Sequence, residues 1–282
     1  MEFFLFRHAD YEKLYSCTYD ISTAPLEKRV HTIHGSLLIA VSTFFVLVYI
    51  PTLLVMYQYL KKTAYQLMIV IGLSDVFILT FVVIPYGIMS ITGDVFCSHP
   101  SLSYIIGCAS GGLWVLSTEM SCILALYRCL ELWRPFVADA LFRGKKTLAW
   151  VGFSFIHLFV TILFGMPIIY SSLVGSMVLN PHAGYIDDAG VISLIQALVI
   201  CSCAAISDAH WTIIFSGQSP SQMVCFVGMY IWICGYGIPG LIYISMNRTV
   251  RHSLLRIVDY NMKRSIVSIS RKVEQVRSQT PL

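Results

Sequence analysis

The sequence predicts an all-α integral membrane protein in which long apolar helices form one bundle. Three observations lead to this class. The chain of 282 residues is 57% hydrophobic and only 12% charged, whereas soluble domains are about 25% charged. Several apolar segments reach the roughly 20 residues that a helix needs to cross a bilayer. Lysine and arginine also gather in alternate gaps between these segments, as basic residues of membrane proteins gather on the cytosolic side.

Six apolar segments qualify as spans by length. They are Gly35–Leu60, Ala64–Ile91, Leu102–Leu126, Leu148–Leu173, Val191–Phe215 and Met223–Met246. Because they fill most of the chain, we expect one bundle over residues 34–247 instead of separate soluble domains. Residues 1–33 are then an extracellular N-terminal segment, and residues 248–282 are a basic cytosolic tail.

The loops predict which end of each span faces the cytosol. The loop after the first span carries Lys61 and Lys62, and five basic residues lie between residues 128 and 146 after the third span. The loops after the second and fourth spans carry none. The N-terminus is therefore expected outside the cell. The gap after the fourth span, SMVLNPHAGYIDDAGVISL, is expected outside as well.

The basic tail conflicts with six crossings. Between residues 248 and 277 there are eight lysine and arginine residues against two acidic ones, a net charge of +6, and such a tail suits the cytosolic face of a membrane. Two further crossings from an outside gap would leave the tail outside. We therefore expect that one span is missing between Tyr185 and Leu194. The alternative is a true six-span protein with an unusual charge pattern.

Two charged residues in the first half are candidates for a conformational switch. Asp75 lies near the middle of the second span, where an acid costs about 3 kcal/mol to insert, so its side chain should face the bundle interior. It is either a polar hub that changes partners, a cation or proton site, or a structural acid kept neutral. Arg128 closes the third span. It either bonds neighbouring helices and later a partner, or simply extends its charge to the interface.

The later spans carry further candidates. Pro239, within GYGIPG, predicts a kink in the last span, with Tyr243 one turn beyond it. The pair is a switch or only a packing feature. Asp208 and Trp211 lie in the outer part of the preceding segment, where they would contact a small ligand or anchor the span in the interface. Glu119 is a second intramembrane acid, beside serines and a threonine that could bond it locally.

Several kinds of function are not indicated. The chain has no nucleophile, P-loop or zinc-protease motif, and no cysteine and histidine set with metal-ligand spacing, so no enzyme activity, cofactor or metal is expected. The basic tail lacks interleaved aromatic residues, which argues against nucleic acid as a partner. Only Cys17 and Cys97 lie in segments expected to face an oxidising compartment. Whether they pair stays open.

Five phrases carry a resemblance. They are VYIPTLLVMYQYLKK, YQLMIVIGLSDVF, GDVFCSHPSLSYIIG, LALYRCLEL and GYGIPGLIYISMNRTVR. In this order they resemble the nematode serpentine chemoreceptors of class T, over roughly Val48–Leu179 and Gln196–Arg251. The resemblance implies a bundle of the seven-transmembrane receptor type, with only six spans evident. Span 5 and the basic loop after it, on the order of 35–40 residues, are not in the sequence.

The resemblance also assigns residues. Asp75, Arg128 and Tyr243 match the family's polar positions in spans 2, 3 and 7, and Cys97 matches the cysteine before span 3. The sequence departs at Tyr127, where the family usually has asparagine, and at Thr52, where it usually has cysteine. The usual disulfide partner of Cys97, in the loop after span 4, is absent because that loop has no cysteine. Cys17 is left as the outer candidate.

The resemblance implies a chemosensory G-protein-coupled receptor at the plasma membrane. A small external ligand would bind near Tyr86, Trp114, Asp208 and Trp211, and a heterotrimeric G protein would contact the cytosolic face around Arg128. Membrane lipid is the remaining partner. Two other functions are compatible with the sequence. One is a truncated or inactive isoform held in the endoplasmic reticulum, and the other is a six-span transporter or channel.

Overall fold

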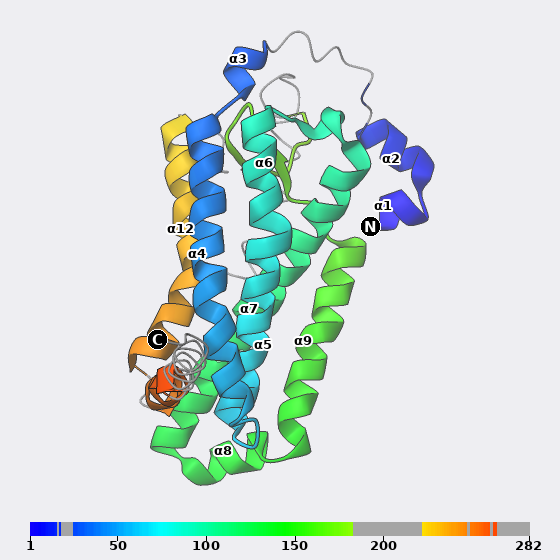
Figure 1. Ribbon diagram of the computed structural model, residues 1–282. Coiled ribbons are helices and arrows are strands. Elements are labelled where there is room, and N and C mark those ends of the chain that lie inside the picture. Colours follow the sequence, from blue (N-terminus) through cyan, green and yellow to red (C-terminus); the bar gives the residue numbers. More distant parts are fainter. Residues whose placement is uncertain (16, 18–24, 183–221, 247–248, 260–261, 264–282) are drawn as a thin grey trace, which may run out of the picture.

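Long helices stand side by side in one bundle (Figure 1). The computed structural model describes residues 1–15, 17, 25–182, 222–246, 249–259 and 262–263. Within these residues, five helical stretches are long and apolar enough to cross a membrane: Leu26–Tyr57, Thr63–Thr92, Pro100–Trp133, Lys145–Phe164 and Cys225–Ser245. The all-α membrane class is therefore confirmed. The predicted segment Val191–Phe215 lies outside the described residues.

The elements follow one another along the bundle. The first stretch comprises α3 (Leu26–Arg29) and α4 (Thr32–Tyr57), and the second comprises α5 (Thr63–Ile78), the π-helical turn η2 (Leu79–Val83) and α6 (Ile84–Thr92). Then come η3 (Phe96–Ser98), α7 (Pro100–Trp133), α8 (Pro135–Phe142), α9 (Lys145–Phe164) and α12 (Gln222–Met246). Residues 249–259 are also helical. The remaining elements are α1 (Glu2–Leu5), α2 (His8–Leu14), β1 (Ile169–Ser171) and β2 (Ser176–Val178).

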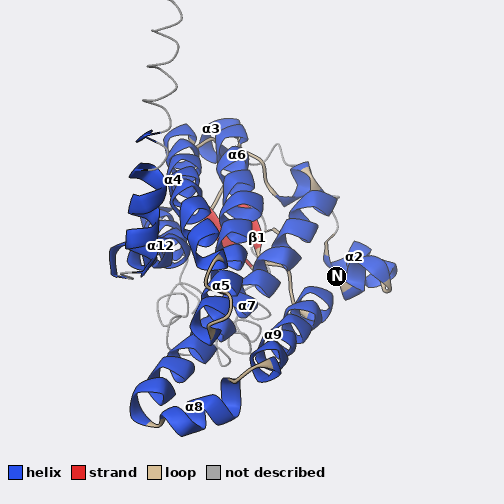
Figure 2. Ribbon diagram, turned by 60° about the horizontal axis from the view of Figure 1, so that its bottom comes forward, coloured by secondary structure: helices blue, strands red, loops and turns tan. Residues whose placement is uncertain are grey.

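The two ends of the bundle differ, as Figures 1 and 2 show. The strands β1 and β2 lie among the helix ends at one end, which is called the hairpin end. Helix α8 crosses the other end, which is called the α8 end. The chain enters α4 at the hairpin end, so the loop that carries Lys61 and Lys62 lies at the α8 end.

Helices α4 and α6 approach closely because a glycine of one faces a glycine of the other. A Cβ atom on Gly35 would lie 2.4 Å from the carbonyl oxygen of Gly87, and one on Gly87 would lie 2.9 Å from the carbonyl oxygen of Gly35. Larger residues would push the helices apart. Helices in membranes commonly associate through such small residues. This contact fixes the register of α4 against the second span.

The fourth span is shorter than its predicted range, Leu148–Leu173. Helix α9 ends at Phe164, and the chain then leaves the helical path. Gly165 and Pro167 explain the early end, because glycine pays a larger entropic cost in a helix and proline has no amide hydrogen to donate. The apolar residues beyond them have the composition of a membrane span, but they form the strand at Ile169–Ser171.

The two strands form an antiparallel hairpin that packs on the helices. Gly175 supplies the turn with a φ of +74°, which glycine adopts without strain. The Ser172 hydroxyl donates to the carbonyl of Met89 across 2.8 Å, and the Ile168 amide donates to the carbonyl of Gly107 across 3.1 Å. These bonds anchor the hairpin to α6 and α7.

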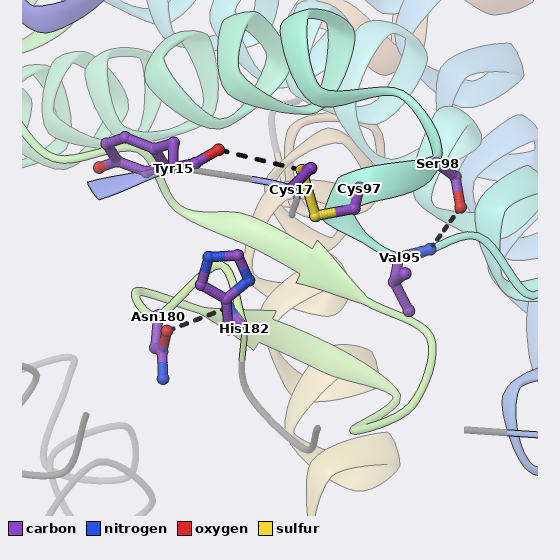
Figure 3. The surroundings of a disulfide bond; sticks show 7 residues. All are labelled: Tyr15, Cys17, Val95, Cys97, Ser98, Asn180 and His182. Atoms are coloured by element: carbon purple, nitrogen blue, oxygen red, sulfur yellow. Dashed lines mark hydrogen bonds between the residues drawn. A yellow bond between two sulfur atoms is a disulfide. The ribbon is translucent and has the colours of Figure 1, made fainter. Parts of the chain in front are cut away.

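The N-terminal segment is attached to the start of the third span by a disulfide between Cys17 and Cys97 (Figure 3). Aromatic packing supports the same attachment. The rings of Tyr11 and Tyr15 meet the ring of Tyr104 edge-on, with centroids 5.1 and 5.0 Å apart. Burial raises the pKa of the Tyr15 hydroxyl, so this phenol stays neutral at ordinary pH. The first helices are thus part of the hairpin end.

Replacing Cys97 by serine is expected to raise amide hydrogen exchange in α1 and α2 by about tenfold or more. The disulfide closes a loop across a sequence separation of 80 residues, and such a link typically contributes about 2–4 kcal/mol. Hydrogen exchange with mass spectrometry measures the change. Cys129→Ser, which removes an exposed free thiol of α7, is the control. Unchanged exchange in Cys97→Ser would mean that aromatic packing alone holds the segment.

Candidate functional site

A buried polar hub joins four helices at Asp75. This carboxyl lies on α5 and is 1% exposed. The hydroxyl of Tyr49, on α4, lies 2.6 Å from Asp75 Oδ2, and the hydroxyl of Ser117, on α7, lies 2.8 Å from Oδ1. The Tyr49 hydroxyl is also 2.8 Å from the carbonyl oxygen of Tyr236 on α12. The polar hub is defined as Tyr49, Asp75, Ser117 and the Tyr236 carbonyl.

The carboxyl of Asp75 accepts hydrogen bonds from two hydroxyl groups. Tyr49 donates to Oδ2, and Ser117 donates to Oδ1. A tyrosine hydroxyl has one proton to donate, and a second acceptor, the Tyr236 carbonyl, lies within the reach of Tyr49. Tyr49 can therefore exchange Asp75 for the backbone of α12 as its acceptor.

Two glycines make room for the Tyr49 ring. A Cβ atom on Gly72 of α5 would lie 3.3 Å from one edge of the ring, and a Cβ atom on Gly240 of α12 would lie 3.2 Å from the other. Both distances are closer than ordinary contact. The ring therefore fits between α5 and α12, and this position brings its hydroxyl to Asp75.

Pro239 lies in the part of α12 that the hub contacts. Its missing amide hydrogen leaves the carbonyl of Gly235 without a helical donor, and Tyr236 is the next residue. Tyr243 lies one turn beyond Pro239. Its ring packs on the apolar cluster around the hub, which includes Tyr49, Ile78 and Ile233. It also packs on a second cluster at the α8 end, which includes Val55, Met56 and Met68. The proline turn thus lies between the hub and the α8 end.

Arg128 lies at the α8 end of α7 and is held by its own helix. Its Nη1 donates to Glu131 Oε2 across 2.9 Å, and the hydroxyl of Tyr127 donates to the other oxygen of Glu131 across 2.9 Å. The Arg128 and Glu131 side chains are 47% and 43% exposed. Such an exposed pair is weak, at about 1 kcal/mol or less. The guanidinium can therefore exchange Glu131 for another partner.

A cleft of about 690 Å³ opens at the α8 end beside Arg128. It is called the end cleft and is lined by three elements: the start of α5 with the two lysines before it, the end of α7, and the end of α12. Arg128, Glu131 and Tyr243 all line it. Two of the predicted switch residues, Arg128 and Tyr243, therefore meet in one cleft, and Asp75 and Pro239 lie deeper in the bundle.

At the hairpin end, two of the four predicted ligand-binding residues are described. Tyr86 is 1% exposed, donates to the Ile168 carbonyl across 3.0 Å, and stacks on Tyr170 of the hairpin at 5.0 Å. Trp114 packs against the same apolar cluster. Asp208 and Trp211 lie outside the described residues. The hydroxyl of Tyr86 thus secures the hairpin.

The partner of Glu119 is a histidine on α9, and not one of the serines or the threonine beside it in the sequence. Glu119 Oε1 bonds His157 Nδ1 on α9, so the pair joins the third and fourth spans. The side chains of Glu119 and His157 are 24% and 41% exposed. Sequence reasoning did not foresee this contact, because a pairing between spans depends on the rotation of both helices.

Sequence reasoning also missed Tyr49 and Glu131. Tyr49 looks like any apolar residue of the first span, and only its place opposite Asp75 gives it a role. Glu131 carried a usable signal. It stands three residues after Arg128, a spacing at which opposite charges meet on a helix.

The chain matches a known protein family. A family model described as the serpentine type 7TM GPCR chemoreceptor Srt matches residues 1–191 and 187–266. No curated protein matches the chain. The two matched segments overlap at residues 187–191, within the stretch where the charge pattern predicts a missing span.

Two substitutions of Asp75 should distinguish how much its hydrogen bonds and its charge each contribute to stability. Asp75→Asn should change the free energy of unfolding by about 1 kcal/mol or less, because its amide offers an oxygen to one hydroxyl and an NH₂ donor to the other. Asp75→Ala should cost about 1–3 kcal/mol, since it leaves buried hydroxyls unpaired. Unfolding in detergent micelles, followed by circular dichroism, measures both. Equal losses in the two variants would show that the hub needs a charged carboxylate.

Proposed function

This chain belongs to the serpentine type 7TM GPCR chemoreceptor family Srt, and from this membership we propose that it binds an external small molecule and signals through a heterotrimeric G protein. Chemoreception is the role of the family. The ligand, the G protein and the signalling step are the proposal.

The observation that carries this proposal is the polar hub with the end cleft beyond it. Asp75 is bonded from α4 and α7, and Tyr49 extends the bonds to α12. Tyr243 of α12 reaches from the cluster around the hub to the end cleft. A small rotation of α12 would exchange the partners of Tyr49 and move Tyr243. The helices therefore have the parts of a two-state element that a ligand could bias.

The external ligand is proposed to bind at the hairpin end. Trp114, beside the apolar cluster, and Tyr86, whose hydroxyl secures the hairpin, are the described candidates. Asp208 and Trp211 complete the proposed set. A ligand that displaced the Tyr86 contact would loosen the hairpin and shift the packing of α6 and α7. This movement would be transmitted to Ser117, which lies about three turns along α7 from Gly107, where the hairpin bonds this helix.

The G protein is proposed to contact the end cleft around Arg128. The weak Arg128–Glu131 pair would hold the guanidinium in the resting state. In the signalling state, Arg128 would bond the partner instead, and Asp75, Pro239 and Tyr243 would connect this exchange to the hub. No covalent chemistry is involved.

The proposed topology places the hairpin end outside the cell, at the plasma membrane, and the α8 end in the cytosol. This orientation puts Lys61, Lys62 and the basic tail on the cytosolic side, as the positive-inside rule requires. Because the N-terminus is then outside and the tail is in the cytosol, the chain needs an odd number of crossings. The family match divides into two segments at residues 187–191, which is where the charge pattern places the missing crossing.

The proposed absence of a span favours one rival proposal, a truncated isoform that does not signal and is retained in the endoplasmic reticulum. The cytosolic ends of spans 5 and 6 would normally contribute to a partner's docking surface. A six-span transporter or channel is the weaker rival. Such proteins pair intramembrane acids along a path, whereas Asp75 is bonded by hydroxyls and Glu119 by a histidine of the next span.

Arg128→Ala is expected to abolish G-protein activation while leaving surface expression intact, because the exposed pair with Glu131 contributes little stability. A nucleotide-exchange assay in membranes, with surface labelling in parallel, measures both. Arg134→Ala is the matched control. Arg134 follows the same helix but contacts the Trp133 ring instead of the end cleft. Undiminished activation by Arg128→Ala would exclude the role given to Arg128.

The topology can be tested with a cysteine placed in the tail. We expect Ser268→Cys to resist a membrane-impermeant maleimide in intact cells and to react after permeabilisation, because the basic tail should lie in the cytosol. A cysteine at Ser98, in the loop expected outside, is the positive control at the cell surface. Labelling of the tail in intact cells would contradict the orientation and favour six crossings.

A further inference from the structure

The end cleft is positively charged and should attract an anion. Its charged lining residues are Lys61, Lys62 and Arg128 against Glu131, a net charge of +2. Both lysines are exposed. None of the ion pairs among the described residues includes either lysine. The positive charge is therefore available to a bound group.

The start of α5 adds to this attraction. The helix begins at Thr63 without a side-chain cap, and both Thr63 and Ala64 line the cleft. The first amides of a helix have no intrahelical acceptor and carry a partial positive charge, which suits phosphate. The two lysines immediately precede these amides. Charge and backbone donors thus converge on the same wall of the cleft.

Arg128 faces the same space from α7. Its contact with Glu131 uses Nη1, and a guanidinium has five N–H donors in all. Its planar fork matches phosphate oxygens, whereas lysine acts as a point charge. The volume of about 690 Å³ falls in the range of small-molecule sites, about 300–1,000 Å³.

We propose that the end cleft is a binding site for a phosphate-bearing anion, held by Lys61, Lys62, the first amides of α5 and Arg128. The end cleft lies at the end of membrane-spanning helices, where the headgroup of a phosphoinositide would supply such a group, and a soluble inositol phosphate would present the same chemistry. The site does not depend on the proposed receptor function. Bound phosphate would draw Arg128 away from Glu131.

The chain offers a matched control for this proposal. Helix α9 also begins with two lysines, Lys145 and Lys146, after a residue that makes no side-chain cap. It starts near the same end of the bundle but does not line the end cleft. A general attraction between basic residues and anionic lipid would involve both lysine pairs, whereas a built site would involve only Lys61 and Lys62.

The test uses the full chain in nanodiscs of phosphatidylcholine, titrated with fluorescent phosphatidylinositol bisphosphate. Lys61→Ala/Lys62→Ala should weaken saturable binding by about tenfold or more, because it removes two of the three cationic side chains that line the end cleft. Lys145→Ala/Lys146→Ala should change it less than about threefold. Arg128→Gln should weaken it as well, which would place the anion inside the cleft. Equal thermal stability of all variants serves as the folding control.

Soluble inositol trisphosphate separates the two sources of phosphate. Competition by this compound supports a site that reads the headgroup alone. Binding of the lipid without competition, still lost in the Lys61 and Lys62 variant, supports a lipid site that also needs the acyl chains. Equal losses in the two double-lysine variants, or no saturable binding by the unmodified chain, would overturn the proposal.

Discussion

The bonding of one buried carboxyl by two hydroxyl groups is the constraint on which the centre of this bundle depends. Asp75 is almost completely buried within the membrane-spanning helices, so its carboxyl oxygens need hydrogen-bond partners on neighbouring helices. Tyr49 and Ser117 supply those partners from neighbouring spans. Each of the three helices is therefore held in both rotation and depth. A helix turned by one residue would leave the carboxyl or a hydroxyl unpaired.

Close packing makes this bonding possible. The glycine contact between α4 and α6 fixes the register of the first two spans. Gly72 and Gly240 leave space for the Tyr49 ring. The bond from Tyr49 to the backbone of α12 lies beside Pro239, where the helix has lost a donor. The centre thus combines tight packing on one side with a weakened turn on the other. This combination favours discrete alternative arrangements over gradual deformation.

The two ends of the bundle have opposite properties. The hairpin end is closed by hydrogen bonds, by tyrosine stacking, and by a disulfide that attaches the N-terminal segment instead of the loop after the fourth span. The α8 end has an open cleft and exposed charges. The proposed receptor function requires a signal to pass from the hairpin end to the α8 end. The proposed loss of the fifth span would remove part of the docking surface at the α8 end without touching the hub.

The sequence by itself determined the class and most spans, because length and hydropathy decide which segments cross a bilayer. It also indicated Asp75, since an acid at mid-bilayer must face the interior. It extended the fourth span too far, because a strand of apolar residues has the same composition as a helix end. Only the tertiary structure decided that Tyr49 and Ser117 bond Asp75 and that Glu119 meets His157. These pairings depend on how helices distant in sequence are rotated and spaced, which no local pattern encodes.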